Sequence, residues 1–224
     1  MYLETIFIDA RTALLLFGCL LLAFTGWVFG IKFLKLGNHI LGYEYLIVGS
    51  SGLNFLFYNI TLYQPSYDLM IYLDAFSRAF GFPILGTLGF LAVTHNYKVP
   101  TRAKVTLFVT TLGLSAVMLL SDFVLSILPY FYLVIMYLFC FYLFYVSKKL
   151  FDIGRKGLGV FLFTTTLASL LIASIYDFYK IPGEETNVVF NFYFLALVSW
   201  SISFIAMYCA YVALNKGLVL KGKQ

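Results

Sequence analysis

The sequence predicts an all-α integral membrane protein with seven transmembrane helices. Of its 224 residues, 62% are hydrophobic and 11% are charged, and the mean hydropathy of +0.93 lies outside the range of soluble domains of this length. The apolar residues gather in seven runs of about 20, the length at which a helix crosses a ~30 Å hydrocarbon core. We expect one domain over residues 1–224, with helices at about 12–31, 40–62, 69–95, 103–121, 123–146, 157–177 and 188–214.

The first run, 12–31, is long enough to span the membrane and to be retained as the first helix. Its N-terminal flank contains Glu4 and Asp9 instead of the basic segment of a cleavable signal peptide. Gly26 and Gly30 form a GxxxG spacing, which lets another helix approach closely. We expect this face to pack within the chain, and a homodimer interface is the alternative.

The second run, 40–62, contains Gly49-Ser50-Ser51-Gly52, which resembles the GxSG string of intramembrane serine proteases. A serine nucleophile needs a base within hydrogen-bond reach. The two histidines, His39 and His95, fall at the inner ends of runs, more than ~10 Å along the membrane normal from Ser51 at 1.5 Å per residue. We therefore expect these small residues to serve helix packing.

The third run, 69–95, holds an acid and a base close together well inside it. Asp74 and Arg78 are four residues apart, so in a helix they share a face, with their Cβ atoms about 6 Å apart. Ionisable side chains at membrane depth normally face the interior of a bundle or a water-filled cavity. We expect this helix to lie at the centre of the bundle.

The boundary between the fourth and fifth runs is marked only by Ser121 and Asp122. We expect a tight turn there, and a long hairpin kinked at Pro129 is the competing arrangement. The fifth run is aromatic on every side. Lipid-facing and interfacial positions account for most of its aromatic residues, and a wall for a flat apolar ligand is the alternative.

The layout resembles that of two seven-helix families without matching the motif of either. With an N-terminus expected outside and Pro83 in the third helix, the layout is similar to that of the microbial rhodopsins. Their retinal needs a lysine in the last helix. Residues 192–215 contain no lysine, so we expect no covalently bound retinal. The two histidines lie near the ends of runs and leave no bis-histidine haem site, so we expect no cofactor. Sugar transporters with a three-one-three layout are similar in length and orientation, but their proline-glutamine pair is absent, and Gln64-Pro65 has the reverse order.

The basic residues predict the orientation. Arg11 and Lys180 are the only bases expected on the outer side, where most of the acids fall. By the positive-inside rule the N-terminus is outside and the C-terminus inside, in a plasma or inner membrane. Twelve bases follow the first, third, fifth and seventh runs: Lys32, Lys35, Lys98, Arg102, Lys104, Lys148, Lys149, Arg155, Lys156, Lys216, Lys221 and Lys223.

This orientation also fits two three-helix units joined by a linker helix. A shift of 117 residues aligns Pro65 with Pro182 and Asp74 with Asn191. Identity in that register is low, so the internal repeat is a hypothesis.

Polar side chains of four runs are expected at similar depths, counted from the outer helix ends at 1.5 Å per residue. They predict a ligand-binding cavity between the second, third, sixth and seventh helices for a small polar or charged solute. The alternative is an internal salt bridge that fixes helix packing. The candidate ligand-binding residues are Asn54, Asp74, Arg78, Ser169, Asn191 and Ser199, with Asn59 and Ser174 nearby.

The expected function is therefore binding or transport of a small solute or ion. A sensor or accessory subunit of a larger membrane complex is the alternative. We expect no enzyme activity and no metal site, because no catalytic triad or phosphate loop is visible and Cys19, Cys140 and Cys209 each stand alone in an apolar run. The connections leave no room for a nucleic-acid-binding domain, so the lipid bilayer is the expected partner.

Overall fold

The computed structural model describes residues 10–179, 182 and 191–221. All the secondary structure of these residues is helical, and seven spans are long and apolar enough to cross a membrane. The predicted all-helical class with seven spans is confirmed. The spans are α1 (Ala10–Lys35), α2 (His39–Thr61), a third span made of α3 (Gln64–Phe76), η1 (Ser77–Gly86) and α4 (Thr87–Thr94), then α5 (Thr101–Leu120), α6 (Asp122–Asp152), α7 (Lys156–Tyr176) and α8 (Phe192–Lys221).

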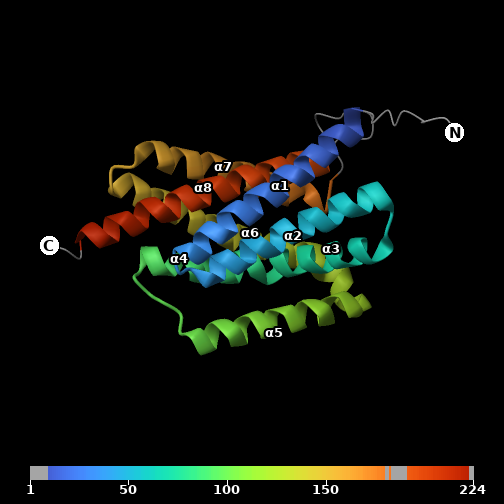
Figure 1. Cartoon of the computed structure of the whole chain (residues 1–224), viewed down its shortest axis with the longest axis horizontal. Helices are drawn as coiled ribbons and strands as arrows, with labels where there is room; N and C mark the ends of the chain where they lie inside the picture. The colour runs from blue at the N-terminus through green and yellow to red at the C-terminus, as the bar shows by residue number, and fades with distance from the viewer. Residues whose placement is uncertain (1–9, 180–181, 183–190, 222–224) are drawn as a thin grey trace.

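Six spans follow one another around a ring in chain order. α1 packs on α2, α2 on α3 and η1, η1 on α6, α6 on α7, α7 on α8, and α8 back on α1. α5 lies outside this ring along one edge of the bundle (Figure 1), where it contacts α3 and α6. The start of α1 and the end of α8 lie at opposite ends of the bundle, as an odd number of spans requires.

The third span is the most deeply buried of the seven, although it lies in the ring and not at its centre. Of the residues in its most apolar window, 61% are buried, against 11% for α5. The third span contacts α2, α5, α6 and α8. In α5 the buried residues are Thr111 and Ser115 alone.

The GxxxG face of α1 packs against α2, within the chain. A Cβ atom added to Gly26 would lie 2.7 Å from the Cα atom of Gly49, and one added to Gly30 would lie 3.0 Å from the carbonyl oxygen of Gly42. Only glycine permits this approach of two backbones. A homodimer, if it forms, must use another face.

The turn between α5 and α6 falls where it was predicted. α5 ends at Leu120, and the Ser121 hydroxyl accepts a hydrogen bond from the backbone N–H of Val124 at 3.4 Å. Pro129 lies inside α6, which continues unbroken to Asp152. The competing hairpin kinked at Pro129 is wrong.

The middle of the third span is a π-helix, which the sequence analysis did not predict. This segment, η1, contains Pro83. Proline has no backbone N–H and its ring clashes with the carbonyl of the preceding turn, so a wider turn relieves the clash. Segments of this kind are frequent at functional sites.

An aromatic cluster fills the bundle near the C-terminal end of α1. The ring of Phe33 lies 5.0 Å from that of Tyr45 and 5.2 Å from those of Tyr208 and Tyr211. Phe90 of α4 joins it, with its ring 5.8 Å from Tyr211. These side chains tie α1, α2, α4 and α8 together at this end.

Candidate ligand-binding cavity

A cavity of about 470 Å³ lies inside the ring of six spans. Its volume falls in the ~300–1,000 Å³ typical of small-molecule sites. Every span except α5 contributes lining residues. α8 lines it from Tyr193 to Met207, which is about 21 Å along the helix at 1.5 Å per residue. The cavity is therefore elongated along the bundle.

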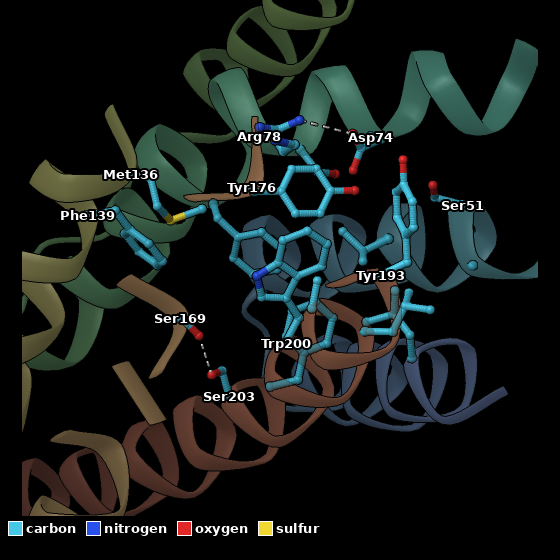
Figure 2. A pocket seen from close by; sticks show the side chains of 18 of the residues that line it. Ser51, Asp74, Arg78, Met136, Phe139, Ser169, Tyr176, Tyr193, Trp200 and Ser203 are labelled. Atoms are coloured by element: carbon cyan, nitrogen blue, oxygen red, sulfur yellow. Dashed lines mark hydrogen bonds and ion pairs between the residues drawn. The ribbon is translucent and has the colours of Figure 1, made fainter. Parts of the chain in front are cut away.

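The walls are mainly apolar and aromatic. Phe55, Phe82, Phe139 and Phe204 line them. Trp200 lies in the middle, with Arg78 and Asp74 beyond it on one side and a pair of serines on the other (Figure 2). Such walls favour a ligand whose body is apolar.

One end of the cavity carries three charged groups. The Arg78 guanidinium lies 3.7 Å from the Asp74 carboxylate and forms a closer ion pair with Asp177, which directly follows α7. The side chains of Arg78, Asp177 and Asp74 are 16%, 19% and 35% exposed. Two acids face one guanidinium, so this charged cluster has one negative charge in excess when both acids are ionised.

Two tyrosine rings hold the arginine in place. The guanidinium carbon of Arg78 lies 4.1 Å from the ring centroid of Tyr132 on α6 and 4.9 Å from that of Tyr176 on α7. Cation–π contacts of this kind are worth ~0.5–2 kcal/mol each. Arg78 is thus fixed by two acids and two rings, whereas Asp74 is the most loosely held and most exposed member of the cluster.

Three buried polar groups along the cavity lack hydrogen-bond partners among the described residues. They are the hydroxyls of Ser77 and Thr166 and the indole N–H of Trp200, and all three residues line the cavity. An unsatisfied buried donor or acceptor costs ~1–3 kcal/mol. A ligand or water in the cavity would supply the missing partners.

Three of the six predicted site residues line this cavity: Asp74, Arg78 and Ser169. The Ser169 hydroxyl lies 2.9 Å from that of Ser203 and 3.5 Å from that of Ser199. Ser199 is therefore next to the lining without being part of it. The serines join α7 to α8 beside the cavity.

The predicted asparagines, Asn54 and Asn191, make hydrogen bonds that join or cap helices and do not line the cavity. Asn54 accepts a hydrogen bond from the Ser66 hydroxyl at 3.3 Å, which joins α2 to α3. Asn191 accepts from the backbone N–H of Phe194 at 3.2 Å and so caps α8. Of the two nearby candidates, Asn59 donates to Phe55 of its own helix at 2.7 Å, and the Ser174 hydroxyl lies 2.9 Å from that of Tyr137.

Ser51 lines the cavity and also joins two spans. Its hydroxyl donates to the backbone carbonyl of Met70 on α3 at 3.3 Å. The neighbouring glycines, Gly49 and Gly52, face α1. These contacts agree with a packing role for the GxSG string.

Sequence reasoning missed two acids that matter here. Asp177 is the last residue of the predicted helix 157–177, at the same end of the bundle as Asp74 and Arg78, and it was not recognised as a partner of Arg78. Glu44 is visible as a single acid near the start of the second run, and it is fully buried. The available signal was an acid at membrane depth, whether or not a base accompanies it.

No group of three histidine, cysteine, aspartate or glutamate side chains able to hold a metal ion occurs in the described part of the chain. Comparisons with models of protein families, with curated proteins and with solved structures gave no match.

Proposed function

We propose that this multi-pass membrane protein binds a small elongated ligand in its central cavity. The observation that carries the proposal is the cavity of about 470 Å³ whose apolar walls end at the charged cluster of Asp74, Arg78 and Asp177. The unpartnered groups of Ser77, Thr166 and Trp200 offer hydrogen bonds along it.

The cluster selects the head group of the ligand. Arg78 is already engaged by both acids and both rings, so it offers little to an anionic ligand. Asp74 is 35% exposed and its nearest cationic nitrogen lies 3.7 Å away, so its oxygens are available as acceptors. With one negative charge in excess, the cluster favours a head group that donates hydrogen bonds, above all an ammonium group.

Fluorescence titration tests this proposal. Trp27 and Trp200 are the two tryptophans, so a Trp27→Phe background reports on the cavity through Trp200. We expect a saturable change with decylammonium in lipid nanodiscs and none with decanoate. Asp74→Asn should abolish the response, while Asp68→Asn, an exposed aspartate on the same helix, should retain it. Equal responses to both probes, or indifference to Asp74, would exclude the proposed site.

The orientation belongs to the same proposal: N-terminus outside, C-terminus inside, in a plasma or inner membrane. Its support is the charge asymmetry of the connections. In a cysteine-free background, Glu185→Cys should react with an impermeant thiol reagent added outside, and Arg155→Cys should react only after permeabilisation. The opposite labelling pattern would invert the topology.

A sensor or accessory subunit is the alternative proposal. It predicts a protein that needs a partner to remain stable in detergent. The fluorescence titration separates the two roles, because a subunit without a ligand gives no saturable response from Trp200. Transport, the further step beyond binding, would require the aromatic cluster around Phe33 to open.

A further inference from the structure

Glu44 on α2 is a fully buried acid outside the charged cluster. Its side chain is 0% exposed, and neither carboxyl oxygen has a hydrogen-bond partner among the described residues. Both ion pairs found in the described part of the chain involve Arg78, so neither compensates Glu44. An ionised acid in such surroundings has a large desolvation cost, whereas the neutral acid does not.

The carboxyl group sits in a cradle made by the π-helix. A Cβ atom added to Gly81 of η1 would overlap the Glu44 carboxyl, so the missing side chain at this position is what makes room for it. Ser77, one turn earlier in η1, lies beside the same carboxyl. Its hydroxyl is buried with no hydrogen-bond partner other than this carboxyl among the described residues, and Ser77 also lines the cavity. Ser77 therefore lies between the cavity and Glu44.

The groups around Glu44 favour an acid that can donate. The Ser77 hydroxyl oxygen, which lies beside the carboxyl, can accept a hydrogen bond. A protonated carboxyl has an O–H to donate, whereas a carboxylate only accepts. On the η1 side Ser77 and Gly81 are uncharged, and on α2 the titratable group that interacts with Glu44 is the phenol of Tyr45.

We propose that Glu44 is an intramembrane proton-binding site that exchanges its proton with the central cavity through the Ser77 hydroxyl. In uptake, a hydronium ion in the cavity gives a proton to the Ser77 oxygen and becomes water, while Ser77 passes its own hydroxyl proton to the carboxylate, so that an O–H bond forms on Glu44 and Ser77 stays neutral. A metal cation fits poorly, because Glu44 and Ser77 supply three side-chain oxygens where hard cations take ~6 or more oxygen ligands. The proposal requires the cavity but not its ligand.

Infrared spectroscopy of the full chain in nanodiscs, without added ligand, tests the protonation state. At neutral pH we expect a carbonyl band from a protonated carboxylic acid that disappears in Glu44→Gln and persists in Asp68→Asn. Glu44→Asp should move the band without removing it, which covers the case of a Gln variant that folds poorly. Identical spectra for the wild type and a folded Glu44→Gln variant would overturn the proposal.

Exchange into D₂O tests the route. Ser77→Ala should slow the deuterium shift of the Glu44 band by about tenfold, the effect of ~1.4 kcal/mol on the exchange barrier. Ser115→Ala, which removes a buried hydroxyl of α5 outside the cavity, should leave the rate unchanged. An unchanged rate in Ser77→Ala would refute this route, and a carboxylate band that responds to sodium or potassium would identify a cation site instead. A failed fluorescence titration would leave both infrared results standing.

Discussion

The third span and α5 are neighbours of similar hydropathy with opposite surroundings. Their mean hydropathies are 1.4 and 1.8, yet 61% of the first window is buried and 11% of the second. In α5 the buried polar residues bond to their own helix, since Thr111 donates to Leu107 and Ser115 donates to Thr111. In the third span, Asp74 and Arg78 face the cavity. The third span is thus distinguished by Arg78, whose further partners belong to other parts of the bundle: Asp177, Tyr132 and Tyr176.

The largest expected difference between these two spans concerns their arginines. Arg78→Gln leaves Asp74 and Asp177 without their cation, and breaking a buried ion pair costs ~3–5 kcal/mol. Partial exposure of the cluster lowers the expected loss to about 2–3 kcal/mol. Arg102→Gln, at an exposed position in the first turn of α5, should change stability by less than ~0.5 kcal/mol. Thermal unfolding in detergent measures both, and equal losses would contradict the contrast.

Double variants sharpen the same comparison. Because Asp177 makes the closer ion pair with Arg78, Arg78→Gln with Asp177→Asn should recover more stability than Arg78→Gln with Asp74→Asn. The second pair leaves the less exposed carboxylate uncompensated. Unfolding midpoints of the two double variants, each compared with Arg78→Gln, provide the measurement. The reverse ranking would show that Asp74 is the main partner.

A glycine pair gives the next effect. Gly81→Ala introduces a methyl group that overlaps the Glu44 carboxyl, and overpacking of this kind costs ~1–3 kcal/mol. Gly113→Ala in α5 meets no atom within 4 Å and gains up to ~1 kcal/mol of helix propensity. Adding Glu44→Ala to Gly81→Ala should recover part of the loss. In thermal unfolding we expect Gly81→Ala to lower the unfolding midpoint and Gly113→Ala to raise it. An unchanged midpoint in Gly81→Ala would show that the Glu44 carboxyl is not tightly packed against Gly81.

The smallest effect concerns a hydrogen bond between the third span and α5. The Tyr72 hydroxyl donates to the backbone carbonyl of Leu112 at 2.9 Å, and such a bond contributes ~0.5–1.5 kcal/mol. Tyr72→Phe should raise amide hydrogen exchange in α5 while leaving the ring of six spans protected. Tyr63→Phe, at an exposed position, should leave exchange in α5 as it is. Increased exchange throughout the ring of six spans would show that α5 does not loosen independently of the ring.

Much of the fold could be predicted from local pattern. Apolar runs gave the spans to within a few residues at most ends, and the four-residue spacing placed Asp74 and Arg78 on one face. The peripheral place of α5 could not be predicted, because lipid tails are as apolar as a protein interior and hydropathy does not distinguish them. The π-helix could not be predicted either, because a proline inside an apolar run does not determine whether the helix kinks, breaks or widens.

The candidate site was harder to predict than the fold. Asp177 lies 99 residues from Arg78 in the chain, so their contact depends on how α7 docks against the third span. Depth counting brought Asn54 and Asn191 into the candidate set because depth says nothing about which way a side chain points. Glu44 was overlooked because it has no base near it in sequence, although that lack is what makes it unusual.

The position of α5 outside the ring has a consequence for how the chain threads the membrane. α5 lines no part of the cavity, yet it reverses the direction of the chain once between α4 and α6. Without it, α6, α7 and α8 would each cross in the opposite sense, and Asp177 would emerge on the side opposite Arg78. The basic residues between α6 and α7 would also change sides. Although α5 packs on few neighbours, its presence therefore determines on which side of the membrane α7 ends, and so whether Asp177 can reach Arg78.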